Sequence, residues 1–353
     1  METSVLNSGP ARVRRATAQL RFLADARKSG RVAFFWWNSR NFGDASMWFA
    51  AERLFAGTPL VRYPDFLTIA NPVGSALARN IAFDLTICGG GTLLSKPFFR
   101  VLEELRERSG RMVALGTGIG SPGIETGSQA DRGLDPDLVT HMHAFDELHL
   151  RGPHSVDAAR SSGFAGPLTQ SGDMVLALTP DEAFPHEGDG LVFVVGYDEV
   201  PEVRDYSEQL VAAALQRGTD VTFLSMNPVD DARALELHRR HGRPVMLSNS
   251  WSTPEHFMGT LAQFGSMVTF RLHGAVYASM MGLPNVLVQT VRKMSDFATT
   301  VGADDFCVPL GSLPAAELMA LADPRRAVDP IRTACLDGRA HLRTTAEGIM
   351  AGR

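Results

Sequence analysis

The sequence predicts an α/β protein of two Rossmann-like domains that face each other across a cleft. Its 353 residues are enough for two domains. From about residue 31, short apolar runs alternate with longer helical patterns, as in parallel sheets with crossover helices. Residues 179–190 are rich in proline, glycine and acidic residues, which is typical of a linker. We therefore expect domains at 1–178 and 190–325, followed by a helical segment at 326–353.

The expected strands fall into two sets, one in each half of the chain. In the first half they are residues 32–37, 83–88, 112–115 and 147–150. In the second half they are residues 191–195, 221–224, 245–247, 267–270 and 286–288. Open parallel sheets bind ligands outside the carboxyl ends of their strands. The loops that follow these runs are therefore the places to search for a site.

Composition and charge exclude several classes of protein. A formal net charge of −5 leaves no broad basic face for nucleic acid. Cys88, Cys307 and Cys335 match no zinc spacing and no disulfide framework, so we expect no metal and a reducing, cytoplasmic compartment. The first ten residues lack an apolar signal core, and no window offers the ~18 apolar residues of a membrane span.

The stretch 12–28 carries six basic residues, with leucines and Phe22 between them. It fits an amphipathic helix on the acidic inner face of a membrane. It also fits a helix packed on the first domain with a solvated basic face, and this second interpretation is preferred. Peripheral membrane contact therefore stays an alternative.

The loop after the first strand reads NSRNFGD, residues 38–44. Gly43 permits an unusual backbone angle, and a helical pattern follows from Ala45. Asp44 either caps that helix or directs its carboxylate into the cleft as a general base for a sugar hydroxyl. The sequence leaves both roles open.

Two glycine-rich loops follow the next strands of the first half. Gly89, Gly90 and Gly91 lead towards a helix expected at 96–109, so their amides either approach an anion at its N-terminus or permit tight packing. The loop GTGIG at 116–120 lacks the full spacing of a dinucleotide fingerprint and does not predict NAD binding.

Arg151 precedes a helix that is expected from Pro153. A cation is not stabilised at the positive end of a helix unless an anion joins it. Arg151 is therefore either a ligand-binding residue or the partner of a carboxylate on a neighbouring loop. Asp173 is one carboxylate that would hold an arginine in place.

The segment Arg271-Leu272-His273-Gly274 carries the strongest indication of chemistry. If it is extended, Arg271 and His273 project in the same direction from the end of the strand 267–270. Arg271 can bind a carboxylate or phosphate in bidentate fashion, and His273 can move a proton near neutral pH. Lys293, after the last strand, adds a further cation to the predicted cleft.

In their order and spacing these segments resemble the polysaccharide pyruvyl transferase family. The resemblance rests on N-x-G-D (41–44), the turn 89–91, GTGIG (116–120), R-G-P-H-S (151–155), G-D (172–173), R-L-H-G (271–274), G-L-P (282–284) and Lys293. It implies a glycosyltransferase-B-like fold, phosphoenolpyruvate as donor and a pyruvate ketal on a saccharide as product. Relatives often carry a basic residue where this chain has Tyr197, so either Tyr197 replaces that contact or the substrate differs.

The resemblance and the residues together predict the site. His273 is the expected general acid and Asp44 the expected general base, with exchanged roles as the alternative. The expected substrate-binding residues are Arg271, Lys293, Arg151, Asn41, Gly90, Gly91, Thr117 and Gly118. No cofactor or metal is expected besides the donor phosphoenolpyruvate. The sequence leaves open which saccharide is the acceptor, whether it is lipid-linked, and the oligomeric state.

Two other functions fit the same fold. One is a glycosyltransferase that uses a nucleotide sugar, and the other is a sugar-binding protein without catalytic activity. Protection by a nucleotide, rather than by phosphoenolpyruvate, would indicate the first. Ligand binding that survives the loss of both His273 and Asp44, without any turnover, would indicate the second.

Overall fold

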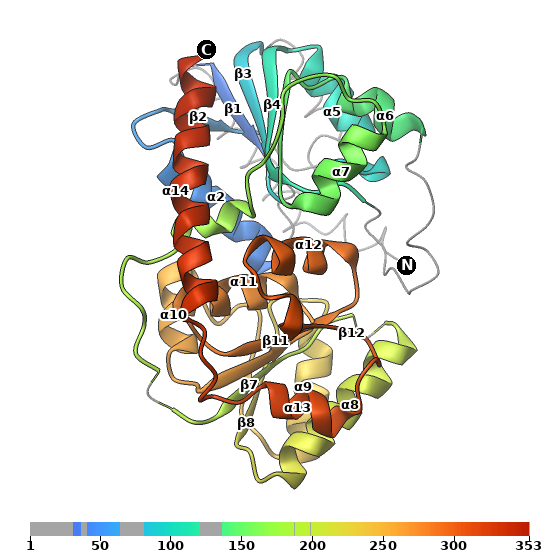
Figure 1. The fold of residues 1–353 in the computed structure, drawn as a ribbon, viewed down its shortest axis with the longest axis vertical. Helices are drawn as coiled ribbons and strands as arrows, with labels where there is room; N and C mark the ends of the chain where they lie inside the picture. The colour runs from blue at the N-terminus through green and yellow to red at the C-terminus, as the bar shows by residue number, and fades with distance from the viewer. Residues whose placement is uncertain are drawn as a thin grey trace, which may run out of the picture.

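The computed structural model describes residues 31–36, 41–63, 81–120, 136–186, 188–197 and 199–352. The basic stretch 12–28 lies outside these residues. Each half of the described chain forms a six-stranded sheet whose strands are all parallel, and helices cover both faces of each sheet (Figure 1). The prediction of an α/β fold with two Rossmann-like units is therefore confirmed.

The N-terminal sheet has the order β2-β1-β3-β4-β5-β6. Its strands are β1 (Val32–Phe35), β2 (Leu60–Arg62), β3 (Phe83–Gly89), β4 (Ser109–Thr117), β5 (Glu147–Leu150) and β6 (Leu168–Gln170). Its helices are α2 (Phe42–Leu54), η2 (Lys96–Phe98), α5 (Phe99–Arg106), α6 (Pro136–Met142), α7 (Pro153–Ser161) and η3 (Met174–Leu178). The strand order reverses between β1 and β3, which makes their carboxyl ends the switch point of this sheet.

The C-terminal sheet has the order β12-β11-β10-β7-β8-β9 and reverses between β7 and β10. Its strands are β7 (Leu191–Val194), β8 (Val221–Leu224), β9 (Val245–Met246), β10 (Ser266–Thr269), β11 (Asn285–Gln289) and β12 (Cys307–Pro309). The helices that follow are α8 (Pro201–Gln216), α9 (Asp231–His241), α10 (Pro254–Leu261), α11 (Leu272–Met281), α12 (Arg292–Thr300), η4 (Asp304–Phe306), α13 (Ala315–Leu321) and α14 (Asp329–Ala351).

The largest apolar cluster joins the two sheets into one core. It contains Phe34 and Leu85 of the N-terminal sheet together with Val194 and Met267 of the C-terminal sheet. Helix α2 reaches across the interface, because the amide of Phe42 donates to the carbonyl of Met226 at 2.9 Å. The Phe42 ring also packs against three aromatic rings of the C-terminal half, those of Trp251, Phe257 and Tyr277. The mutual orientation of the halves is thus built into the core.

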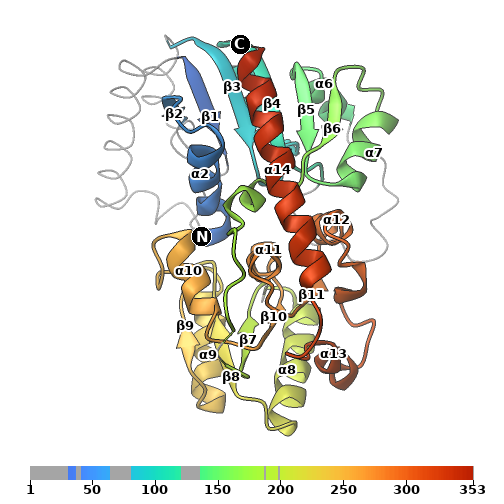
Figure 2. The same ribbon diagram turned by 60° about the vertical axis from the view of Figure 1, so that its left-hand side comes forward.

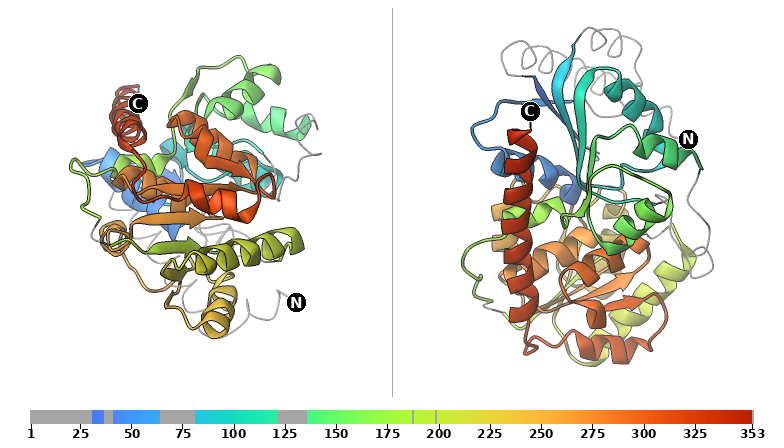
Figure 3. Two further views of the ribbon diagram at one scale, coloured as in Figure 1. Left: turned by 60° about the horizontal axis from the view of Figure 1, so that its bottom comes forward. Right: turned by 45° about the horizontal axis from the view of Figure 1, so that its top comes forward.

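Helix α14 runs from the C-terminal half back to the N-terminal sheet, as Figure 2 shows along its length and Figure 3 shows from two further directions. It packs against α11 in one half and against η3 and α2 in the other. At its far end, Nη1 of Arg111 donates to the carbonyl of Ile349 at 2.7 Å, which satisfies a terminal carbonyl of the helix. Neither α14 nor any other helix within the described ranges is long and apolar enough to cross a membrane.

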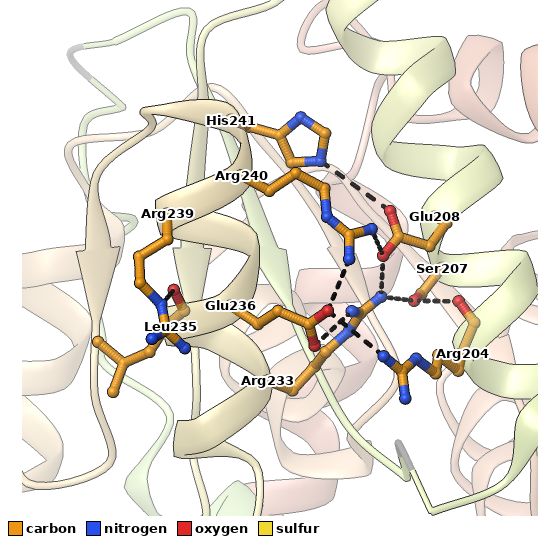
Figure 4. Close-up of polar contacts among 9 residues, drawn as sticks. All are labelled: Arg204, Ser207, Glu208, Arg233, Leu235, Glu236, Arg239, Arg240 and His241. Atoms are coloured by element: carbon orange, nitrogen blue, oxygen red, sulfur yellow. Dashed lines mark hydrogen bonds and ion pairs between the residues drawn. The ribbon is translucent and has the colours of Figure 1, made fainter.

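A cluster of charged side chains links helices α8 and α9 (Figure 4). Arg233 is 3% exposed and donates to Glu208 at 2.6 Å and to Glu236 at 3.0 Å. Arg240 binds the same two carboxylates, each at 2.6 Å, but its side chain is 47% exposed. The two arginines therefore share two carboxylate partners, but Arg233 binds them in buried surroundings and Arg240 in solvent-exposed ones.

We expect Arg233→Ala to lower the free energy of unfolding by about 2 kcal/mol, the scale of lost hydrogen bonds to charged groups. Arg240→Ala is the matched control and is expected to cost less than about 1 kcal/mol, because exposed ion pairs are solvated and screened. Urea denaturation of both variants measures the difference. Equal losses in the two variants would contradict the assignment of Arg233 as the buried centre of the cluster.

Candidate functional site

His273 lies at the interface of the two halves, on the first turn of α11. Its imidazole packs against the start of α2, where a Cβ added to Gly43 would lie 2.1 Å from Nδ1. On its other side, Nε2 lies 3.9 Å from Oδ2 of Asp173. The residue is only 6% exposed. His273, which the sequence predicts to be catalytic, is therefore held between two segments of the N-terminal half.

The electrostatic surroundings of His273 bring several predicted site residues together. Burial lowers the pKa of His273 below its ordinary value of 6.5. The carboxylates of Asp173 and Asp44 act in the opposite direction, and the cations of Arg151 and Lys293 lower the pKa further. The ring is therefore neutral at pH 7, and a bound anion would raise its pKa.

Arg151 and Asp173 form a buried ion pair next to this histidine. Arg151 is 1% exposed and Asp173 is fully buried, with 3.1 Å between Nε and Oδ2. Nη2 of Arg151 donates to the carbonyl of Gly91. In the described part of the chain, neither Nη1 of Arg151 nor Nε2 of His273 has a hydrogen-bond partner. Because buried polar atoms are normally paired, these two nitrogens indicate where a polar ligand would bind.

Arg271 precedes α11, and the partners of its guanidinium among the described residues, Asp230 and Tyr197, belong to its own half. Its guanidinium binds Asp230 in bidentate fashion, with Nε 2.8 Å from Oδ2 and Nη2 2.6 Å from Oδ1. Since α11 begins at Leu272, His273 is helical and its side chain diverges from that of Arg271. The expectation that the two side chains project in the same direction was wrong, because the segment is not extended.

Tyr197 covers the face of the Arg271 guanidinium, with 4.1 Å from Cζ to the ring centroid. Its φ is 59°, and it is the only non-glycine residue with positive φ in the described ranges. Burial raises the pKa of Asp230, while Arg271 and the backbone amide of Tyr197 lower it. At the switch point of the C-terminal sheet, an aromatic ring thus stands where the family resemblance led us to expect a cation. Strained backbone of this kind clusters at functional sites.

The start of α2 decides between the two roles left open for Asp44. Asn41 is the N-cap, and its Oδ1 accepts from the amide of Gly43 at 3.0 Å. The helix consequently begins at Phe42, three residues before the expected Ala45. Capping by Asp44 was therefore wrong, and its carboxylate belongs to the first turn, partly exposed. The predicted ligand contact of Asn41 stays a prediction beside its capping role.

The backbone of the glycine turn at residues 89–91 forms hydrogen bonds within the protein. Gly90 and Gly91 have φ of 67° and 63°, in the left-handed region that favours glycine. The amide of Gly90 donates to Leu115 and the carbonyl of Gly91 accepts from Gly118, both at 3.0 Å. The next helical turn begins only at Lys96, so the expectation that these amides lie at a helix N-terminus was wrong.

Thr117 occupies the interior between two loops. It is fully buried, and its hydroxyl accepts from the amide of Leu93 at 3.0 Å. The hydroxyl thus supports the loop that carries Leu93, and a substrate contact from Thr117 stays a prediction beside this role. Gly118 is buried as well, but a Cβ at this position would lie 3.7 Å from Nη1 of Arg151. Gly118 therefore borders the unpaired nitrogen that marks the site.

Asp296 of α12 was missed by the sequence analysis. It is 2% exposed and accepts from the amide of His154 at 2.8 Å and from the hydroxyl of Ser155 at 2.6 Å. A Cβ on Gly152 would lie 2.3 Å from its Oδ1. The carboxylate therefore fills the positive end of α7 from the opposite half. It also fixes the helix that carries Lys293.

The structure brings together His273, Asp44, Arg151 and Lys293 and separates Arg271 into an adjoining cluster with Asp230 and Tyr197. Asp173, Asp230 and Asp296 are carboxylates that link or hold the predicted cations and helices. Among the described residues, no group of three or more histidines, cysteines or acids is arranged to hold a metal ion. The arrangement suits binding of a small anion beside a residue that can transfer a proton.

Comparison with protein families gives a match between residues 41–290 and the sequence model of the polysaccharide pyruvyl transferase family. Comparison with curated protein sequences gave no significant match.

Solved structures with this fold include two UDP-N-acetylglucosamine 2-epimerases. The enzyme from Rickettsia bellii has a TM-score of 0.60 and 11% identity, over 92% of this chain and 96% of that one. The enzyme from Methanocaldococcus jannaschii, in complex with UDP-GlcNAc and UDP, has a TM-score of 0.58 and 11% identity, over 90% and 99%. A Thermobaculum terrenum O-GlcNAc transferase mutant aligns with a TM-score of 0.45 and 15% identity, over 92% of this chain and 64% of that one. The likeness to the two epimerases shows a fold of the glycosyltransferase-B type.

Proposed function

Because the chain belongs to the polysaccharide pyruvyl transferase family, we propose that it moves a pyruvyl group from phosphoenolpyruvate to a saccharide and forms a cyclic ketal. The observation that carries the proposal is a pair of buried nitrogens without partners in the described chain, Nη1 of Arg151 and Nε2 of His273, on two residues that share the carboxylate of Asp173. The charges of Asp44 and Lys293 also act on this imidazole. A donor with a carboxylate and a phosphate needs cations, and a ketal-forming transfer needs groups that move protons. Both kinds of group are present within one interdomain site.

The unpaired nitrogens support binding of the donor between the two halves. Nη1 of Arg151 and Nε2 of His273 are buried without partners in the described chain, and the ammonium of Lys293 acts on the same ring. We assign these three groups to the phosphate and carboxylate of phosphoenolpyruvate. Arg271 is a further donor contact in this proposal, although Asp230 already offsets much of its charge.

The reaction balances without a cofactor or a metal. Protonation of the methylene carbon converts it to a methyl group and leaves the adjacent carbon cationic. One saccharide hydroxyl adds to that carbon and gives up its proton. Cleavage of the carbon–oxygen bond then releases phosphate, and a second hydroxyl of the same saccharide closes the ring and loses its proton.

His273 and Asp44 divide these proton transfers in the proposal. A neutral imidazole becomes a competent acid once the donor's negative charge raises its pKa. We therefore assign the proton donor to His273 and the base for the saccharide hydroxyl to Asp44. The reverse assignment uses the same two groups.

Two measurements test the proposed function. Phosphate release from phosphoenolpyruvate should require a saccharide, and Arg271→Ala should abolish it. A thermal-shift comparison should show a higher melting temperature with phosphoenolpyruvate, because a ligand that binds only the native state stabilises it. Normal turnover by Arg271→Ala would overturn the assignment of this residue.

A nucleotide-sugar glycosyltransferase is the second candidate, and the epimerase neighbour solved with UDP-GlcNAc is the observation that favours it. In that case UDP-sugars should raise the melting temperature while phosphoenolpyruvate has no effect. A shift with phosphoenolpyruvate alone would oppose this candidate.

A further inference from the structure

A cavity of about 1230 Å³ opens between the two halves beside the proposed donor site. One wall is the exposed side of α7, and the others are α8, the start of α12 and the loops after β11 and β12. Strands β11 and β12 end at Gln289 and Pro309, so the cavity lies at the carboxyl ends of parallel strands, where open sheets bind ligands. Arg292 and Ser295 of α12 face it, whereas Lys293 of the same turn acts on His273.

Two polar stripes line opposite sides of this cavity. On α7, His154, Asp157 and Ser161 recur at helical spacing, and on α8 the stripe is Glu202, Asp205 and Gln209. Glu202 and Asp205 are exposed and form no ion pair within the described chain. Their carboxylates are therefore available to accept hydrogen bonds from a ligand.

The charges of the side chains that line the cavity favour one class of ligand over another. Among the described lining residues, Asp157, Glu202 and Asp205 contribute carboxylates and Arg292 contributes a guanidinium. Asp157 pairs with Arg160 at 3.8 Å, which leaves the carboxylates of α8 to set the charge of the opposite wall. Like charges placed opposite one another disfavour binding, so a diphosphate or nucleotide is excluded from this wall. Hydroxyl groups, in contrast, are neutral donors that suit carboxylate acceptors.

Buried residues in the wall of the cavity also favour a ligand that carries hydroxyl groups. Thr290 lines the cavity at 2% exposure, and the contact of its hydroxyl within the described chain is the sulfur of Met294 at 3.6 Å, a weak acceptor. The hydroxyl of Tyr206 is bound to the carbonyl of Leu313 at 2.7 Å, which fixes its ring in the wall. The volume exceeds the ~300–1,000 Å³ of most small-molecule sites, so a ligand of more than one ring has room.

We propose that this cavity binds a neutral oligosaccharide, the acceptor of the pyruvyl group. The inference rests on the proposed function, because it names the substrate class of the second half of that reaction. The carboxylates of α8 accept from sugar hydroxyls, and the hydroxyl of Thr290 donates to the sugar. The acceptor then spans α7 and α8, with its reacting end towards α12 and His273.

A plug in the cavity tests its location. Ala158 of α7 lines the cavity, so Ala158→Trp should fill it, whereas Ala212→Trp, at an exposed alanine of α8 outside the lining, is the matched control. The probes are neutral tri- and tetrasaccharides of galactose, glucose and mannose, observed by saturation-transfer NMR and titration on the full chain. We expect at least tenfold weaker binding in Ala158→Trp and unchanged binding in Ala212→Trp.

A charge-neutralising variant tests the ligand class and avoids any problem of folding. Glu202→Gln with Asp205→Asn alters two exposed side chains and should weaken binding of the neutral saccharide about fivefold or more, in line with lost charge-assisted hydrogen bonds. For an anionic ligand such as UDP-glucose the same change should strengthen binding. The direction of the effect thus separates the two classes.

The outcomes also separate this inference from the proposed function. One possible result is that Ala158→Trp loses saccharide binding while phosphoenolpyruvate leaves the melting temperature of the unmodified chain unchanged. This result supports the assignment of the cavity to a saccharide and opposes pyruvyl transfer. A response to phosphoenolpyruvate with normal saccharide binding in Ala158→Trp overturns the cavity alone. Lack of binding of every neutral probe by the unmodified chain, or binding of UDP-glucose in their place, overturns it as well.

Discussion

His273→Gln is expected to lower the rate of saccharide-dependent phosphate release by ~10²–10⁴-fold, the usual contribution of one positioned proton-transfer group. Glutamine retains a hydrogen-bonding end group of similar reach but does not titrate. The imidazole is buried between Gly43 and Asp173, and both Asp44 and Lys293 act on it. Steady-state assays with phosphoenolpyruvate and saccharide measure the loss.

The control for this prediction is His256→Gln, which alters an exposed histidine on α10 and should retain full activity. A second measurement uses pH. The folded pKa of His273 lies below 6.5, so the unfolded chain binds the proton more readily, and stability falls as the pH drops from 6.5 towards that lowered pKa. The contribution is fully present above pH 6.5 and should be missing in His273→Gln. Retention of more than a tenth of the activity by this variant would exclude the proton-transfer role.

Asp173→Ala is expected to lower the free energy of unfolding by about 3–5 kcal/mol, the cost of leaving a buried charge without its partner. Arg151 is 1% exposed and cannot turn to solvent, and its partner carboxylate is fully buried. The same carboxylate also accepts from the amide of Val175 at 3.0 Å and so caps η3. Urea denaturation followed by circular dichroism measures the change.

The matched control is Asp220→Ala. Asp220 pairs with Arg243 at 3.2 Å, but its side chain is 72% exposed, so the expected cost is under about 1 kcal/mol. If Asp173→Ala proves as mild as the control, Arg151 must have another way to satisfy its charge. The loss of Asp173 should also disturb His273, so activity should fall even at temperatures where the variant remains folded.

The central strands of both sheets could be predicted from the sequence, whereas most of the strands at the edges of the sheets could not. Strands β1, β7 and β10 are buried at every residue, and β1 and β7 consist of apolar residues throughout. The strands that were not predicted, β2, β6 and β12, have three residues each and lie at the ends of the sheet orders. Their partly exposed positions leave too little periodicity for a pattern to emerge.

The types of residue in the site could be predicted from the sequence, whereas the pairs that these residues form with each other could not. His273 and Lys293 follow strands of the C-terminal sheet and Asp44 follows a strand of the N-terminal sheet. Parallel topology brings such strand ends to one edge of each sheet. Asp230 and Asp296, in contrast, have partners that are distant in the chain. Asp230 binds Arg271, 41 residues away, and Asp296 binds the start of α7, 141 residues away. An acidic residue in a helix, such as Asp296, or just before one, such as Asp230, carries no local signal for a partner at that separation. Arg271 therefore appeared as a free cation until its partner was known.

The return of α14 to the N-terminal half has a mechanical consequence. The chain joins the two halves at residues 179–190 and again along α14, and two attachments define a hinge axis rather than a free pivot (Figure 2). Because the halves also share one apolar core, their relative motion is most restricted on the side of α14. On the side of α7 and α12, the hydrogen bonds from His154 and Ser155 to Asp296 add a polar tie between the halves.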